Sequence, residues 1–305
     1  MSSRGLPRLP AVRDLIKLYG LSAKSQLSQN FILDKNVTDK IAKCANIIPE
    51  NSVVVEVGPG PGLLTRSLLD LGVRNLVAVE KDRRFVPALE QLAEASGGRL
   101  KIIQGDMLKV DHMDILARFG NPTSQDSDTT LHLVGNLPFS VATPLLAQWL
   151  GRLWEKSGFF ARHQSAMTLM FQKEVADRIV APVSTSPRGR LSVAAQSLCR
   201  ARLAYNLPGS SFVPRPKVDA AVVHLTPLDQ PLLAVTFAEL EHVSRFLFSS
   251  RRKTLRRIMR NWDDRGLVCL EESDLDANVR PQDLTTEQFN RLAASIVRSN
   301  LVMPP

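Results

Sequence analysis

The stretch whose residue types best suit chemistry is Glu56–Gly62, which has the order Glu-x-Gly-x-Gly-x-Gly. A valine-rich run at residues 53–57 overlaps its start and predicts a strand buried on both faces. Residues 63–69 follow with helical spacing. A strand, a glycine turn and a helix form the first βα unit of a nucleotide-binding sheet. The N–H groups of such a turn can bind a polar ligand without side chains in the way.

The order of the glycines narrows the choice of ligand. A Walker loop needs Gly-Lys-Ser/Thr at the start of the helix, but Gly62 is followed by two leucines. The dinucleotide fingerprint also fails, because the third glycine comes one place too early. A ligand without a pyrophosphate, whose amino-acid end lies against bare backbone, suits this order, and S-adenosylmethionine is such a ligand. The alternative is an ordinary tight turn.

Two further acids are predicted at the same edge of a parallel sheet. Glu80 ends a predicted strand about 20 residues after Gly58, which is the spacing of an acid that binds a ribose. Asp106 follows the next predicted strand and is placed to accept a hydrogen bond from an adenine amino group. Because the carboxyl ends of parallel strands line one crevice, we expect Glu56, Glu80 and Asp106 to meet there. Each acid alone would be an ordinary turn residue.

A second informative stretch, Asn136-Leu137-Pro138-Phe139, follows another predicted strand. The exocyclic amine of a base is a poor nucleophile, because its lone pair is delocalised into the ring. Hydrogen bonds to the Asn136 side-chain oxygen and to the carbonyl of Leu137 or Pro138 would favour tetrahedral nitrogen. Phe139 can stack on an extruded base, which is worth about 1–3 kcal/mol. A sulfonium is a good leaving group, so positioning can supply most of the rate. The alternative is a strand-to-helix turn plugged by an aromatic ring.

Two other segments are predicted to wall the crevice. The amides of Gln29 and Asn30 stand beside the apolar pair Phe31 and Ile32, upstream of the sheet. Phe212 precedes two prolines and could face Phe139 across the target base. A proline-stiffened hairpin is the alternative there.

The net charge of +9 and the isoelectric point near 9.8 indicate a polyanionic partner or an acidic surface. The range Arg245–Arg260 contains basic residues and no acid, and its apolar residues share one helix face. This pattern favours a phosphate-binding helix over a merely solvated surface. The predicted RNA-binding residues are Arg251, Arg252, Lys253, Arg256, Arg257 and Arg260.

Composition excludes several classes of protein. No apolar run reaches the roughly 18 residues of a membrane span. The three cysteines are far apart and odd in number, which indicates neither a disulfide framework nor a zinc site.

The first thirteen residues carry three arginines and no acid. That composition fits an organelle-targeting start and an ordinary disordered tail equally well.

The predicted strands alternate with helices through most of the chain, and lie at residues 53–57, 75–80, 100–104, 131–135, 166–171, 202–205 and 220–225. From Pro227 onward the apolar spacing is helical throughout. We therefore predict an α/β fold, a Rossmann-like class I methyltransferase sheet with a small C-terminal all-helical domain. The methyltransferase domain would cover residues 1–228, with an N-terminal helical extension, and the helical RNA-binding domain residues 229–305.

Taken together, these motifs resemble the ribosomal RNA adenine N6,N6-dimethyltransferase family. The matching segments, in family order, are Gln29–Phe31, Glu56–Gly62, Glu80, Gly105–Asp106, Asn136–Phe139, Phe212–Asp219 and Arg251–Thr254. The leader around Leu9–Asp14 is similar to the animal mitochondrial members. The resemblance implies S-adenosylmethionine-dependent dimethylation of two adjacent adenosines in a stem-loop of small-subunit rRNA, in support of ribosome assembly in the mitochondrial matrix.

The resemblance also implies roles for single residues. The implied cofactor-binding residues are Gln29, Asn30, Ile32, Gly58, Gly60, Glu80, Lys81, Asp106, Met107 and Asn136. The implied adenine-binding residues are Asn136, Leu137, Pro138, Phe139 and Phe212. Many relatives have Tyr where this chain has Phe139, which removes a hydroxyl but keeps the stacking face. We expect a monomer that binds the rRNA stem-loop or the small ribosomal subunit, with no metal and no membrane.

Two other functions remain open. The mitochondrial members also resemble transcription accessory factors, so the chain could bind DNA or a polymerase of the mitochondrial transcription machinery and keep the methyltransferase fold as a scaffold. The intact cofactor and target motifs argue against a scaffold alone. A DNA adenine methyltransferase fits the target tetrapeptide more loosely, and the C-terminal resemblance disfavours it.

Overall fold

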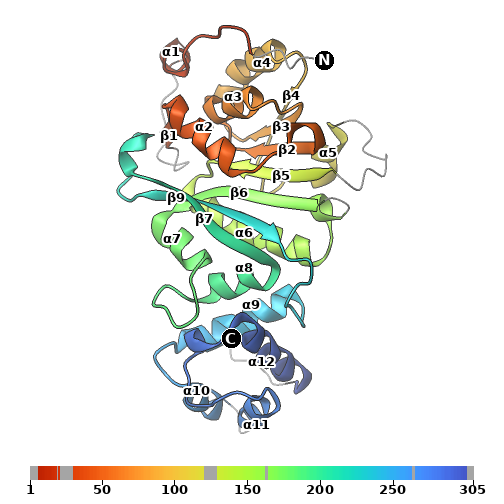
Figure 1. Ribbon diagram of the computed structural model, residues 1–305, viewed down its shortest axis with the longest axis vertical. Helices are drawn as coiled ribbons and strands as arrows, with labels where there is room; N and C mark the ends of the chain where they lie inside the picture. The colour runs from red at the N-terminus through yellow and green to blue at the C-terminus, as the bar shows by residue number, and fades with distance from the viewer. Residues whose placement is uncertain are drawn as a thin grey trace. The chain divides into compact units, whose positions relative to one another are not determined.

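The structure is a computed structural model that describes residues 6–18, 20, 30–119, 129–161, 164–262 and 265–300 (Figure 1). The chain divides into two compact units. The first, which we call the sheet unit, comprises Met1–Leu146, Lys156–Ala176 and Arg202–Thr226. The second, the helical unit, comprises Ala147–Glu155, Asp177–Ala201 and Pro227–Pro305.

A seven-stranded sheet organises the first unit, in the order β4-β3-β2-β5-β6-β9-β7 (Figure 1). Its strands are β2 (Ser52–Val57), β3 (Asn75–Glu80), β4 (Leu100–Gln104), β5 (Thr130–Gly135), β6 (Gln164–Gln172), β7 (Cys199–Leu207) and β9 (Ala220–Pro227). The pairs β2–β3, β3–β4, β2–β5 and β5–β6 are parallel, and β9 runs antiparallel to β6. This sheet confirms the predicted Rossmann-like α/β fold.

The strand order of the sheet reverses at β2, and this reversal determines where the crevice lies. From β2 the chain moves outward through β3 to β4, and then returns to the other side of β2 for β5. The carboxyl ends of β2 and β5 therefore flank a switch point, where open α/β sheets bind their ligands. Glu56 lies near the end of β2, and Asn136 follows the last residue of β5. The two informative stretches of the sequence thus meet at one edge.

A separate two-stranded antiparallel sheet joins distant parts of the chain. It pairs β1 (Phe31–Ile32) with β8 (Phe212–Val213), in the register Phe31 to Val213 and Ile32 to Phe212. The pairing places the Asn30 segment beside the proline-containing loop. These are the two segments that were expected to wall the crevice.

Local signals explain where several helices begin. The helices that start in the sheet unit are α1 (Val12–Leu18), α2 (Lys35–Cys44), α3 (Leu63–Asp70), α4 (Val86–Ala95), α5 (His112–Ala117), α6 (Phe139–Trp154) and α7 (Lys173–Ile179). Asp34 caps α2 by accepting from the Asn36 N–H at 2.9 Å. Gly62 is the left-handed residue before α3, with φ 84°. Pro138 lies immediately before α6, where a proline does not break the helix.

The second unit is helical, as predicted. Its helices are α8 (Arg190–Leu198), α9 (Phe237–Ser249), α10 (Leu255–Arg260), α11 (Arg265–Glu272) and α12 (Thr286–Arg298). Capping boxes start α9 at Thr236 and α12 at Thr285. The predicted boundary near Leu228 lies beside the division after Thr226, but the unit also takes residues 147–155 and 177–201. The RNA-binding role given to residues 229–305 stays a prediction. Within the described residues, no helix is both long and apolar enough to cross a bilayer.

Candidate active site

The glycine turn at the end of β2 leaves its backbone uncovered. Gly58 and Gly60 have φ of 66° and 53°, in the left-handed region that favours glycine. A Cβ on Gly60 would lie 3.5 Å from the ring of Phe31, and one on Gly58 would face the Asn136 carbonyl and the Pro138 ring at 4.0 Å. The turn is therefore held between Phe31 on one side and the Asn136 loop on the other.

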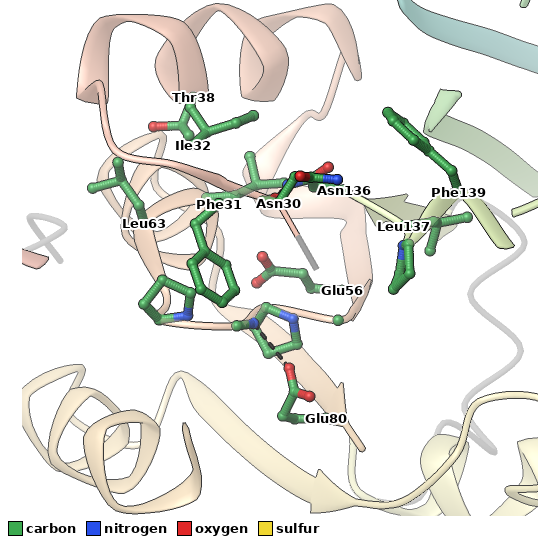
Figure 2. Close-up of a pocket in the computed structure, with 16 residues that line it drawn as sticks. Asn30, Phe31, Ile32, Thr38, Glu56, Leu63, Glu80, Asn136, Leu137 and Phe139 are labelled. Carbon is green, nitrogen blue, oxygen red and sulfur yellow. Dashed lines mark hydrogen bonds between the residues drawn. The ribbon is translucent and has the colours of Figure 1, made fainter. Parts of the chain in front are cut away.

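A pocket opens at this turn (Figure 2). Its lining residues are Asn30, Phe31, Ile32, Thr38, Glu56, Gly58, Pro59, Gly60, Pro61, Leu63, Leu64, Glu80, Asn136, Leu137, Pro138 and Phe139. A second pocket continues from it, lined in part by Lys81, Asp106 and Met107, and it shares Gly58, Glu80 and Pro138 with the first. The crevice thus has two compartments that meet at Glu80, which suits an extended ligand with two different ends.

Glu80 joins the two compartments. Its Oε2 accepts from the Gly60 N–H at 2.9 Å (Figure 2), and its Oε1 accepts from the Asp82 N–H at 2.7 Å. The side chain is buried, and burial raises the pKa of Glu80 above its ordinary value although the two N–H groups oppose the rise. Each oxygen keeps a lone pair that could accept from a ribose hydroxyl. The position agrees with the predicted ribose contact, which stays a prediction.

Glu56 is the most unusual group in the pocket. It is 1% exposed, and its Oε2 has no hydrogen-bond partner among the described residues. Burial, assisted by the negative charge of Glu80, raises the pKa of Glu56 to about 8. A buried acceptor without a partner, in a pocket lined by bare backbone, is matched to a ligand that brings a donor or a positive charge.

Lys81 and Asp106 form an ion pair at the second compartment. The Lys81 Nζ lies 2.9 Å from Asp106 Oδ2, and the Leu108 N–H donates to Asp106 Oδ1 at 3.1 Å. Burial alone would raise the pKa of Asp106, but these two hydrogen bonds and the positive charges of Lys81 and Lys109 together lower it below its ordinary value. The carboxylate is therefore charged at neutral pH and can accept from an amino group. Met107 is buried beside it and offers an apolar surface.

The Asn136–Phe139 loop lies across the mouth of the first compartment. The strand before it must end in glycine, because a Cβ on Gly135 would lie 2.8 Å from the Val57 carbonyl oxygen. The Leu137 side chain is 1% exposed and points into the protein, so the backbone of Leu137 is the part available to a ligand. Asn136 and Phe139 are half-buried and line the pocket. Figure 2 shows both side chains above Glu56 and Glu80 in that view.

Gln29 lies outside the described residues. Phe212 is only 2% exposed and belongs to the main apolar core, against which Phe139 also packs. In this structure the Phe212 ring is not open to a base. Its stacking role stays a prediction that would require β8 to move.

The predicted RNA-binding residues lie in the helical unit, on α10 and the turn before it. Leu255, Ile258 and Met259 face the core, as the spacing predicted, and the basic residues are exposed. Arg251 differs from the others, because its Nη2 donates to the Ser186 carbonyl at 2.6 Å and to Gln282 Oε1 at 3.2 Å. Arg251 therefore also fastens a loop of the unit.

The residues of the crevice fit S-adenosylmethionine. The unpartnered Glu56 oxygen suits the ammonium of its amino-acid end, the positive-φ glycines leave room for its chain, and Asp106 beside Met107 suits an adenine. The sheet order and this site together define a class I methyltransferase.

Comparison with known proteins gives the family. A family model described as ribosomal RNA adenine dimethylase matches residues 20–297. The mitochondrial dimethyladenosine transferase 1 of Xenopus tropicalis is 44% identical over 293 residues, which cover 94% of this chain and 84% of that protein. The Homo sapiens protein of that name is 42% identical over 299 residues, which cover 96% and 86%. The chain belongs to the ribosomal RNA adenine dimethylase family, and is an S-adenosylmethionine-dependent rRNA adenine dimethyltransferase.

Solved structures show the same fold. A dimethyladenosine transferase from Plasmodium falciparum superposes with a TM-score of 0.69 at 24% identity, covering 88% of this chain and 98% of that one. The 23S rRNA methyltransferase ErmE gives a TM-score of 0.62 at 22% identity, covering 88% and 100%.

Sequence reasoning missed part of the pocket wall. Glu56 was noted beside the glycines but was not assigned to the cofactor. Thr38 and Leu63 also line the pocket. Leu63 directly follows the glycine turn, so its position could have been inferred. Thr38 carries no signal of its own, because it reaches the pocket only through the packing of α2.

Proposed function

We propose that this enzyme dimethylates the N6 amines of two adjacent adenosines in a stem-loop of small-subunit rRNA, and thereby supports assembly of the small ribosomal subunit. The observation that carries the proposal is the placement of the Asn136 loop over the glycine turn, with Gly58 facing the Asn136 carbonyl and Pro138. A base held by that loop would lie against the same edge of the sheet as the methyl donor.

The chain's own residues would position the target amine. Asn136 Oδ1 and the carbonyl of Leu137 or Pro138 would accept from the two N6 hydrogens, which holds the amine and favours tetrahedral nitrogen. Phe139 would stack on the extruded base, and such stacking is worth about 1–3 kcal/mol. Glu80 and Asp106 would hold the ribose and adenine of the donor.

The donor supplies a methyl group attached to a positively charged sulfur. The N6 nitrogen would form a bond to the methyl carbon as the carbon–sulfur bond breaks and its electron pair goes to sulfur. The proton that the nitrogen then carries in excess would be lost to water. A second cycle with fresh donor would give the dimethylated amine. No covalent intermediate with the protein is required, so catalysis depends on alignment.

The helical unit would bind the RNA backbone. Arg252, Arg256 and Arg257 are exposed on or beside α10, and the protein carries a net charge of +9. Exposed guanidinium groups on one short helix suit phosphates, because each guanidinium can donate two parallel hydrogen bonds to one phosphate. We extend this role to the predicted domain of residues 229–305.

The proposed setting is the mitochondrial matrix, and the proposed state is a monomer. The relatives at about 42% identity are named as mitochondrial proteins, which supports the mitochondrion. The names of these relatives give no support to a transcription accessory role, so we do not propose one.

The test is incubation of undermethylated small ribosomal subunits with the enzyme and labelled S-adenosylmethionine, followed by mapping of the modified bases. We expect label on two adjacent adenosines of one stem-loop. Label on large-subunit rRNA, or on single isolated adenosines, would contradict the proposal. An Asn136→Ala enzyme serves as the inactive control.

A further inference from the structure

The N-terminal segment, which we define as residues 6–18, packs onto the sheet unit. Val12 and Leu15 of α1 are 4% and 5% exposed. Leu6 and Leu9 pack against the main apolar core of the unit. A segment that served only as an import signal would gain nothing from burying two apolar side chains and partly burying two more. The packing therefore indicates a role in the folded enzyme.

One contact leads from the N-terminal segment to the glycine turn. Ile16 packs against a small cluster of Phe31, Phe85 and Leu89. The Phe31 and Phe85 rings meet edge to face, with centroids 5.4 Å apart. The Phe31 ring also lies against Gly60, 3.5 Å from where a Cβ on that glycine would be. The cluster that contains Phe31 therefore contacts α1 through Ile16 and the backbone of the donor pocket through Phe31.

A second contact fastens the N-terminal segment to α3. The Arg66 Nη1 donates to the Pro10 carbonyl at 2.7 Å. Arg66 lies on the first turn of the helix that begins just after the glycines. Leu63, on the same turn, lines both the donor pocket and a cavity bordered by Leu9 and Val12. Two wall residues of the donor pocket, Phe31 and Leu63, therefore have the N-terminal segment behind them.

We propose that the N-terminal segment is a structural part of the donor-binding site, in which Ile16 positions Phe31 against the glycine turn and the Arg66–Pro10 hydrogen bond holds the segment in place. This inference rests on the proposed site for S-adenosylmethionine. Its consequence is that proteolytic processing within residues 6–18 would remove a supporting wall. The mature enzyme in the mitochondrion would then begin at or before Leu6.

The test uses the full chain with Ile16→Ala, and measures binding of S-adenosylhomocysteine by calorimetry. We expect the Kd to rise about fivefold or more, which corresponds to about 1 kcal/mol. Ile16→Val, which keeps most of the packing, should restore most of the affinity. Affinity for a stem-loop RNA should not change. Lys17→Ala is the matched control, because Lys17 is the next residue of α1 and is exposed.

A second variant and a stability measurement keep a structural role apart from a positioning role. Arg66→Met removes the bond to Pro10 without emptying the site, and should weaken donor binding in the same direction. If Ile16→Ala and Arg66→Met lower the melting temperature of the free protein but bind S-adenosylhomocysteine like the wild type, the inference is wrong and the proposed function stands. If the wild type itself does not bind, both are wrong. N-terminal sequencing of the mitochondrial protein that showed a start after Leu6 would also contradict the inference.

Discussion

The side-chain nitrogen of Asn136 donates to the backbone carbonyl of Asn30 at 3.1 Å, and so links the end of β5 to the residue before β1. A backbone carbonyl can only accept, so the nitrogen of the amide must face Asn30. The oxygen is then left to accept from the target amine, as the proposed chemistry needs. Asn30 also lines the donor pocket. Its hydrogen bond with Asn136 therefore links the donor pocket to the residue that is proposed to hold the target amine.

This relationship makes Asn136→Asp a sharper test than Asn136→Ala. The carboxylate keeps an acceptor but loses the N–H donor and is repelled by the Asn30 carbonyl, so it will turn away. We expect methyl transfer to fall about 100-fold or more, since a small misplacement of aligned groups can cost that much. Single-turnover rates with labelled donor measure it. Unchanged RNA affinity is the control, and a near-normal rate would disprove the assigned role of Asn136.

The elements of this site could be predicted where local sequence determines structure. Valines before a glycine turn indicate a buried strand, as they do for β2, while Glu80 ends the next strand and Asp106 comes shortly after the one that follows. Packing between distant segments leaves no such local pattern. Nothing near Phe212 shows that its ring is buried in the same core as Ile32, and nothing in α1 shows that Ile16 packs against the cluster that contains Phe31.

The extent of the helical unit could not be predicted for the same reason. The change in character near Leu228 is visible in the sequence. The helix α8 belongs to the same unit, because it packs against α9 and α12, and Asn290 Nδ2 donates to Ser197 Oγ at 2.7 Å. Residues so far apart in the chain show no shared periodicity that would reveal the contact.

Glu80→Gln should weaken donor binding without removing the fold. The amide can still accept with its one oxygen, but its NH2 group faces one of the N–H groups of Gly60 and Asp82, which then loses its acceptor. The ribose also loses a charged partner, and charge-assisted hydrogen bonds are worth about 1.5–3 kcal/mol. We therefore expect at least a tenfold weaker Kd for S-adenosylhomocysteine by calorimetry. Glu50→Gln is the control on an exposed carboxylate, and equal affinity in the two variants would exclude ribose recognition by Glu80.

Glu56 predicts how the stability of the free protein depends on pH. Its pKa in the folded protein is about 8, against an ordinary value of 4.5. Between these values the folded state holds a proton that the unfolded chain has lost, so this group's contribution to the unfolding free energy falls as pH rises. Glu56→Gln stays neutral and should remove that fall. Urea unfolding at several pH values in this window, compared between the wild type and the variant, checks it. Parallel pH curves would contradict the buried, proton-holding state of Glu56.

Donor binding should reverse the protonation of Glu56. A positively charged ammonium beside the carboxyl favours its ionised form and lowers its pKa. Binding near neutral pH should therefore release a proton, and calorimetry in buffers of different ionisation enthalpy will detect it. Glu56→Gln should bind without this release and more weakly. Proton uptake by the wild type would show that the ammonium lies elsewhere.

Charge reversal on α10 tests the proposed RNA surface. Changing Arg252, Arg256 and Arg257 to Glu should weaken stem-loop binding and flatten its salt dependence. Each phosphate that the protein no longer neutralises takes about 0.7–0.9 from the slope of log K against log salt. Filter binding over a range of salt concentrations measures the slope. Donor affinity should stay as in the wild type, since the donor pocket lies in the sheet unit. An unaltered slope would place the RNA on another surface.

Arg74 and Arg251 separate loss of charge from loss of structure in that experiment. Arg74→Glu reverses an exposed charge in the sheet unit, where the side chain is 55% exposed, and should change the salt slope little. Arg251→Ala removes the hydrogen bonds to Ser186 and Gln282 as well as a charge. It should therefore lower the thermal stability of the protein, which reversal of the other exposed arginines should not do. If Arg251→Ala leaves the stability unchanged but reduces the salt slope, its guanidinium serves the RNA and not the loop.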